Sequence, residues 1–264
     1  MRITNKQVQR FDEDGVVTID TPLTQAQLSA AVDVLDDKLP FRDPEGDAQP
    51  RYRYGLSTYS EELAFVEIVQ HPFFEEVACK ALRADEVTFN GVSATKTFPN
   101  PNAEFSFGQH VDIQYCTSDL DATPRRMICS FFLWLDAVNE RRAPLVARPG
   151  SHRLLADFRE SDPALKAAPI EVKGVTLDNL PELGYADPEP ISAEAGQVSV
   201  LTTALVHGPS TNIGTEPRYS AHITFVPKGF EFIQTPQNVE SQQRHSAELR
   251  KRVSPGRRHI FKDC

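Results

Sequence analysis

The first third of the chain carries its apolar residues at helical spacing. After Thr24 and Gln27, which form a capping-box pattern, apolar residues recur every three or four positions as far as Leu39. Gly15 is placed to end an earlier, short helix, because glycine adopts the left-handed conformation at a helix C-terminus at little cost. The pattern predicts helices over residues 6–13, 28–39, 61–70 and 72–83, with an extended segment at 16–19.

After residue 85 the pattern changes to short runs of β-branched and aromatic residues, separated by Pro, Gly and Asn. Such runs are typical of β-strands bounded by turns. The predicted strands span residues 87–98, 108–115, 127–138, 145–148, 198–206 and 219–226. We therefore expect a mainly β core that the helices of the first third flank.

Three segments fit neither pattern. Residues 41–59 are rich in Pro, Arg, Asp and Tyr and predict a long loop, either a cover over an active site or a solvated connector. Residues 154–190 are acidic and contain several prolines, which predicts an insertion between strands. Residues 240–258 predict a charged, weakly amphipathic helix that either closes one side of the sheet or stays solvated.

A length of 264 residues is enough for one large domain with a sizeable core. We expect a single domain over residues 1–264, without internal repeats. Within it, residues 1–85 are mostly helical support, residues 86–235 are the sheet core with the insertion at 154–190, and residues 236–264 are a C-terminal helix.

Composition narrows the partners and the compartment. The formal net charge of −9 disfavours binding to nucleic acid or to an anionic membrane, and no stretch reaches the roughly 18 apolar residues of a membrane span. The four cysteines show no CxxC spacing, which argues against a zinc ribbon and a disulfide framework. We expect a cytoplasmic protein that binds a small molecule, as a monomer or as a homodimer.

Candidate metal ligands occur in the run Gln109-His110-Val111-Asp112. Residues two apart on a strand point to the same face, so His110 and Asp112 would present an imidazole and a carboxylate side by side. The pattern His-x-Asp is weak by itself, because it also arises by chance on protein surfaces.

A second half of the constellation follows nearly a hundred residues later. A predicted strand leads into His207, and the chain returns with Arg218 eleven residues further on. Two histidines and one carboxylate form the facial triad of non-haem Fe(II) oxygenases, which leaves iron positions open for a bidentate co-substrate and O₂. A guanidinium on the return strand suits the far carboxylate of a dicarboxylate.

With these residues in place, the sequence resembles the phytanoyl-CoA hydroxylase-like family of Fe(II)/2-oxoglutarate dioxygenases through most of its length. Five landmarks occur in the family's order. They are FDEDGVV at 11–17, QHVD at 109–112, Pro144-Leu145, PGSH at 149–152, and His207-Gly208 followed by Asn212 and Arg218.

The resemblance implies a double-stranded β-helix, a cupin-like jelly roll of two packed sheets with the metal at its open end. It implies that His110, Asp112 and His207 bind Fe(II), that Arg218 binds 2-oxoglutarate, and that O₂ is the other co-substrate. All four are accordingly the predicted catalytic residues. Asp112 also disfavours halogenation, because related halogenases replace this carboxylate by a small residue.

Further positions are candidates for the co-substrate and the substrate. Lys96 and Thr97 lie on the strand before the metal motif, where polar residues of relatives reach a 2-oxoglutarate carboxylate. The family often has a serine two residues after the distal histidine; this chain has Pro209 there, so Ser210 is the candidate. The predicted substrate pocket consists of Phe107, Gln109, Tyr115, Phe132, Trp134 and His222. His222 has the alternative of a hydrogen-bonded core residue.

The resemblance predicts oxidation of an unactivated C–H bond in a small molecule, by hydroxylation or by a related radical outcome such as epimerisation, cyclisation or desaturation. Aromatic residues in the segments expected at the pocket mouth favour a ring-containing molecule of bacterial natural-product or antibiotic biosynthesis. Two alternatives remain, because a fold does not fix a function. One is a non-enzymatic jelly-roll protein that binds small molecules; the other is a cupin-like metalloenzyme that does not use 2-oxoglutarate.

Overall fold

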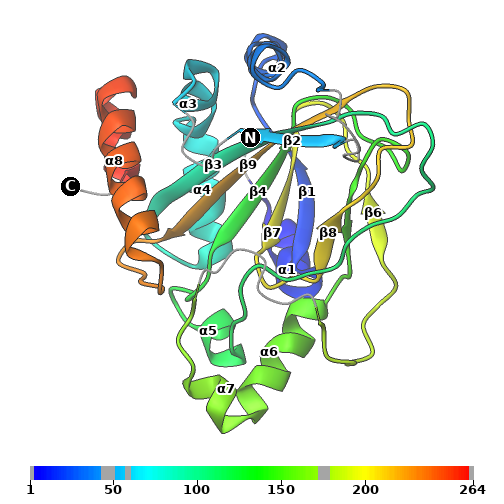
Figure 1. Ribbon diagram of the computed structural model, residues 1–264. Coiled ribbons are helices and arrows are strands. Elements are labelled where there is room, and N and C mark those ends of the chain that lie inside the picture. Colours follow the sequence, from blue (N-terminus) through cyan, green and yellow to red (C-terminus); the bar gives the residue numbers. More distant parts are fainter. Residues whose placement is uncertain (1–2, 43–50, 57–60, 172–178, 262–264) are drawn as a thin grey trace.

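The computed structural model describes residues 3–42, 51–56, 61–171 and 179–261 (Figure 1). A six-stranded antiparallel sheet in the order β1-β7-β4-β9-β3-β2 faces a smaller antiparallel sheet in the order β6-β5-β8. The strands are β1 (Val16–Asp20), β2 (Arg53–Leu56), β3 (Val87–Thr97), β4 (Cys129–Trp134), β5 (Leu145–Ala147), β6 (Glu189–Ile191), β7 (Gln197–Thr202), β8 (His207–Pro209) and β9 (Arg218–Pro227). This arrangement is the predicted jelly roll.

Helices cover the outer side of the larger sheet and its ends. The helices are α1 (Asn5–Asp14), α2 (Gln25–Lys38), α3 (Leu63–Val69), α4 (Pro72–Leu82), α5 (Thr117–Asp121), α6 (Ser151–Ser161), α7 (Pro163–Ala167), α8 (Pro236–Arg252) and the 3₁₀ helix η1 (Pro255–Ile260). Figure 1 shows α3, α4 and α8 on one side of the larger sheet, and β6 and β8 on the other. Among the described residues no helix is both long and apolar enough to cross a lipid bilayer.

Local signals in the sequence explain where the first elements begin and end. The side chains of Thr4 and Thr24 each accept a hydrogen bond from the backbone of a glutamine three residues later, and the glutamine side chain bonds back. Gly15 has a φ of 78°, the left-handed conformation that ends α1 and lets the chain turn into β1. The predicted helices at 6–13 and 28–39 and the extended segment at 16–19 are thereby confirmed.

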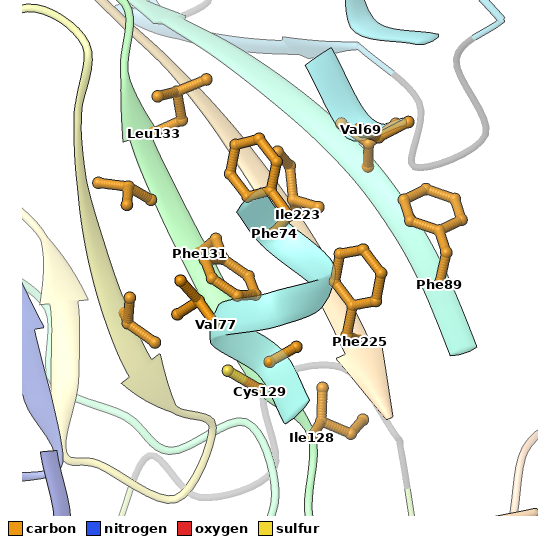
Figure 2. Packing of buried hydrophobic residues seen from close by; sticks show 14 of the residues in the cluster. Val69, Phe74, Val77, Phe89, Ile128, Cys129, Phe131, Leu133, Ile223 and Phe225 are labelled. Atoms are coloured by element: carbon orange, nitrogen blue, oxygen red, sulfur yellow. The ribbon is translucent and has the colours of Figure 1, made fainter. Parts of the chain in front are cut away.

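The main core lies between α4 and the larger sheet. Figure 2 shows Phe74 and Val77 of α4 packed against Phe131, Ile223 and Phe225 of the two central strands. The rings of Phe74 and Phe131 meet edge to face, with centroids 5.4 Å apart, and all five side chains are fully buried. Each contributes roughly 1.5–3 kcal/mol through removal from water. Because side chains alternate along a strand, the neighbours of these residues face the opposite way, into the space between the two sheets.

Several boundaries differ from the prediction. Residues 108–115 form only isolated bridges to the β8 region instead of a continuous strand. The expected loop at 41–59 contains β2, which adds an edge to the larger sheet, while residues 43–50 and 57–60 lie outside the described part. The insertion at 154–190 includes most of α6, all of α7 and the start of β6, which pairs with β5. The C-terminal helix closes one side of the sheet, with Leu249 fully buried.

Candidate active site

Three potential metal ligands converge at the open end of the space between the sheets. One ligand atom from each of His110, Asp112 and His207 lies within 4.8 Å of the other two. Nε2 of His110 is 3.5 Å from one carboxylate oxygen of Asp112, and Nε2 of His207 is 3.7 Å from the other. Two imidazoles and a carboxylate in this proximity form the donor set of a facial triad.

The backbone brings the two halves of the triad together. The amide of His110 donates to the carbonyl of His207 at 2.9 Å, and the amide of His207 donates to the carbonyl of His110 at 3.0 Å. Next to this bridge, Gly208 lies so close to Gly108 that a Cβ on Gly208 would be 1.6 Å from the Gly108 carbonyl oxygen. Only glycine fits at position 208, so the contact itself sets the spacing between the two ligand-bearing segments.

Hydrogen bonds and burial set the protonation of the ligands. Nδ1 of His207 lies 2.8 Å from the carbonyl oxygen of Leu205, which requires a proton on Nδ1 and leaves the lone pair of Nε2 available to a metal. Burial lowers the pKa of His207, so its ring is neutral. Burial opposes ionisation of Asp112, but the hydrogen bond from His110 and the nearby imidazoles lower its pKa overall. The site therefore offers a neutral imidazole at His207 and a carboxylate at Asp112, with the imidazole of His110 beside them.

A cavity of about 240 Å³ extends from the triad between the two sheets. The residues that line it are Arg53, His110, Asp112, Phe132, Trp134, Leu145, His207, Pro209, Arg218 and His222. All four predicted catalytic residues are in this set. The cavity is small, which suits a compact ligand within reach of the metal site.

Arg218 is the only cation among the buried residues of this cavity, within the part of the chain that the structure describes. Its Nη1 donates to Oγ1 of Thr95 at 3.1 Å and to the hydroxyl of Ser220, and its guanidinium lies over the Trp134 ring at 5.8 Å. Burial lowers the pKa of Arg218 to about 9, so the group remains cationic at neutral pH. Its Nε has no hydrogen-bond partner although it is buried. A buried cation with an unused donor suits an anionic ligand.

A row of residues crosses three strands beside Arg218. Arg53 of β2 pairs with Thr97 of β3, and Thr97 pairs with Arg218 of β9. Paired residues of antiparallel strands point to the same face, so all three side chains are on the cavity side of the sheet. The hydroxyl of Thr97 is buried without a hydrogen-bond partner, although Thr97 is not one of the residues that line the cavity. Its role as a co-substrate residue stays a prediction.

The structure places three of the six predicted pocket residues in the cavity wall: Phe132, Trp134 and His222. It does not bring the other three there. Gln109 accepts a hydrogen bond from Arg148. Phe107 packs beside Phe105, and Tyr115 is buried in the core with its hydroxyl 2.9 Å from that of Thr203.

Two predicted co-substrate residues also lie elsewhere. Nζ of Lys96 donates to Asp36 at 2.6 Å and lies over the rings of Phe98 and Tyr219, on the opposite face of the sheet from Thr97. The Ser210 hydroxyl donates to the carbonyl of Pro144 at 2.6 Å. Neither residue lines the cavity.

Sequence reasoning missed Arg53, Leu145 and Pro209 as cavity residues. Arg53 comes from the segment without periodicity, and no local signal marks it. Leu145 begins a predicted strand whose facing was not assigned. Pro209 stands where relatives often carry serine, and this difference was the only sign in the sequence that position 209 belongs to the cavity.

Residues 11–220 match the family model described as phytanoyl-CoA dioxygenase (PhyH). The match includes the triad and Arg218, the residues that meet at the cavity. The chain belongs to the phytanoyl-CoA dioxygenase family. This membership, with the triad, indicates a Fe/2-oxoglutarate-dependent oxygenase and confirms the resemblance seen in the sequence. No curated protein sequence matches the chain.

Solved structures show the same fold at low identity. EvdMO1 is 22% identical with a TM-score of 0.57; the match covers 84% of this chain but only about half (49%) of EvdMO1. The epimerase SnoN, in complex with Fe³⁺, α-ketoglutarate and nogalamycin RO, is 15% identical with a TM-score of 0.64, covering 88% of this chain and 86% of SnoN. EctD from S. alaskensis, with 2-oxoglutarate and 5-hydroxyectoine, is 18% identical with a TM-score of 0.61, covering 88% and 78%.

Proposed function

We propose that this family member oxidises an unactivated C–H bond of a small molecule with Fe(II), 2-oxoglutarate and O₂. The observation that carries the proposal is that one small cavity has the triad at one end and the buried, incompletely hydrogen-bonded Arg218 in its wall. Such a cavity matches a ligand that chelates a metal and also carries a separate carboxylate.

The residues present fit the metal and the co-substrate. His110, Asp112 and His207 would hold Fe(II) through two imidazole nitrogens and a carboxylate oxygen, and the lowered pKa values of His207 and Asp112 favour their metal-binding forms. Arg218 would hold the far carboxylate of 2-oxoglutarate, with Thr97 beside it. When bound, Fe(II) with 2-oxoglutarate and O₂ supplies the oxidising power to break the C–H bond.

The remaining wall of the cavity prepares the site for that chemistry. Phe132, Trp134 and Leu145 exclude water and lower the local dielectric constant. The carbonyl of Leu205 keeps His207 in one tautomer, and the Trp134 ring and the Thr95 hydroxyl hold the guanidinium of Arg218 in place. The protein thus orients the reactants before reaction instead of during it.

We place the substrate among small molecules of bacterial natural-product or antibiotic biosynthesis, in the cytoplasm. The fold similarity to SnoN, an epimerase of nogalamycin biosynthesis, supports this choice. The negative net charge supports a partner other than nucleic acid. Hydroxylation and epimerisation both follow from hydrogen abstraction, and the product depends on how the substrate is held.

The proposal is tested by anaerobic titration of the protein with Fe(II) and then 2-oxoglutarate, following the weak visible charge-transfer band that bidentate chelation of iron produces. We expect the band in the wild type. Arg218→Ala should raise the dissociation constant of 2-oxoglutarate roughly 100-fold, because hydrogen bonds to a buried charged group contribute about 1.5–3 kcal/mol each.

Lys96→Ala is the matched control, since it removes a cation from the same sheet but from the other face. It should leave the affinity for 2-oxoglutarate unchanged. Absence of the band with iron demonstrably bound to the wild type would refute the proposal and favour the cupin-like or binding-protein alternative.

A further inference from the structure

His222 is a cavity residue for which neither the family motif nor the proposed function provides a role. It lies on β9 four residues after Arg218, so both side chains face the space between the sheets. It pairs across the sheet with Phe132 of β4, and the two rings stack at a centroid distance of 4.7 Å and an interplanar angle of 31°. The stack holds the imidazole in one orientation in the cavity wall.

One ring nitrogen of His222 has no hydrogen-bond partner. This atom, Nε2, is buried, so the ring is not the hydrogen-bonded core residue of the alternative interpretation. Burial lowers the pKa of His222 to about 4, so the ring is neutral at physiological pH and carries one donor and one acceptor nitrogen. Buried polar atoms without a partner are rare in proteins, and one in the wall of a ligand cavity is accounted for by a ligand.

The position of His222 indicates which end of a ligand it meets. Four residues of strand span about 13 Å, so His222 and Arg218 are well separated along β9. Arg53 influences the pKa of both residues, but among the described residues Asp112 and His207 act only on that of His222, and Asp136 and Arg142 act only on that of Arg218. His222 is therefore at the metal end of the cavity, and Arg218 is at the far end.

We propose that His222 binds the metal-chelating end of 2-oxoglutarate, by donating a ring N–H hydrogen bond to its 1-carboxylate. The inference rests on the proposed function and deepens it: Arg218 would bind one carboxylate of the co-substrate and His222 the other. The neutral ring adds a directed hydrogen bond without adding charge next to the metal, and its stack on Phe132 keeps the donor in place.

The test compares two ligands under anaerobic conditions, with Fe(II) present. 2-Oxoglutarate has both ends, whereas pyruvate keeps the chelating keto acid and lacks the far carboxylate. Calorimetry should show that His222→Phe, which preserves the ring stack, weakens the binding of both ligands about tenfold. Arg218→Ala should weaken the binding of 2-oxoglutarate but not that of pyruvate. His222→Gln, which keeps an N–H donor, should recover part of the affinity for both.

The charge-transfer band gives an independent readout. A hydrogen bond to the chelating end stabilises the electron-accepting orbital of the ligand, so the band of the 2-oxoglutarate complex should move to shorter wavelength in His222→Phe. His222→Gln should stay close to the wild type. Iron affinity and thermal midpoint, measured for each variant, confirm that the fold and the triad are intact.

The outcomes separate this inference from the proposed function. If the iron-loaded wild type binds no 2-oxoglutarate, the proposed function fails and this inference fails with it. If the wild type binds it and His222→Phe changes neither affinity nor the band, only the role of His222 is overturned. The role of His222 is also overturned if His222→Phe weakens the binding of 2-oxoglutarate but not that of pyruvate, because the hydrogen bond would then be to the far carboxylate. Should His222→Phe not fold, His222→Gln decides the question: smaller losses of affinity for both 2-oxoglutarate and pyruvate support the role of His222, and wild-type affinity for both overturns it.

Discussion

The close contact between Gly208 and Gly108 predicts that Gly208→Ala weakens iron binding. In Gly208→Ala the new Cβ would be 1.6 Å from the Gly108 carbonyl oxygen, whereas real Cβ contacts essentially never fall below 3.0 Å. One backbone segment must therefore move by about 1.4 Å relative to the other. Overpacking of this kind costs about 1–3 kcal/mol of folding free energy.

The larger effect should be on iron. His207 is adjacent to Gly208, and His110 is two residues from Gly108, so the movement separates the two histidine ligands. Metal sites tolerate distance errors of only about 0.2 Å. We expect Gly208→Ala to fold with a lowered thermal midpoint and to bind Fe(II) at least 100-fold more weakly than the wild type.

Gly108→Ala is the matched control, because a Cβ on Gly108 meets no other atom within 4 Å. It should bind Fe(II) like the wild type. The assay is anaerobic Fe(II) titration with a competing chelator, alongside thermal unfolding of the metal-free proteins. Wild-type iron affinity in Gly208→Ala, or equal losses in the two variants, would refute the reasoning that backbone contact sets the ligand spacing.

Three further predictions concern single side chains. Burial lowers the pKa of His152 to about 4, below the roughly 6.5 of an unfolded chain, so the unfolded state binds the extra proton and stability falls as pH drops from about 6.5 toward 4. Urea unfolding should show that the wild type loses about 2 kcal/mol more stability between pH 7 and pH 5 than His152→Gln, because the loss due to His222, whose pKa burial also lowers to about 4, occurs in both; equal losses in the two proteins would contradict it. Thr97→Val removes a buried hydroxyl without a partner, so the metal-free protein should gain about 1 kcal/mol while 2-oxoglutarate affinity, measured by calorimetry, falls several-fold; a loss of stability would contradict the first half. Asp112→Ala removes the only anionic ligand of the triad, and equilibrium dialysis should show Fe(II) retention lost while the thermal midpoint of the metal-free protein changes little; retained iron would argue against the triad.

The sequence identified the centre of the site because few residue types perform its chemistry. His110 and Asp112 are two residues apart, and His207 and Arg218 follow in a fixed order, so their identity was visible without knowing the backbone between them. The backbone itself was predicted less well. The segment at 108–115 has a strand-like composition, yet it makes isolated bridges only, because its partner β8 is three residues long.

The placement of Lys96 failed for a physical reason. The resemblance proposed both Lys96 and Thr97, but neighbouring residues of a strand face opposite sides, so only one of them can face the cavity. A count of alternate residues from Val87 and Phe89, which face the core, would have chosen Lys96. The register shifts between Phe89 and Gly91, and one extra residue reverses the facing of everything after it. Thr97 therefore faces the cavity and Lys96 faces Asp36. The glycine at 91 was the only sign of the bulge in the sequence.

The row of Arg53, Thr97 and Arg218 also contributes to the net charge of the site when iron and 2-oxoglutarate are bound. Iron contributes two positive charges and Asp112 one negative charge, and Arg218 with the co-substrate dianion brings the sum to zero. Arg53 then adds one positive charge, and within the described residues no carboxylate forms an ion pair with it. We expect the loaded cavity to repel cationic molecules and to accept neutral or anionic ones, so a choice among candidate substrates can begin with their charge.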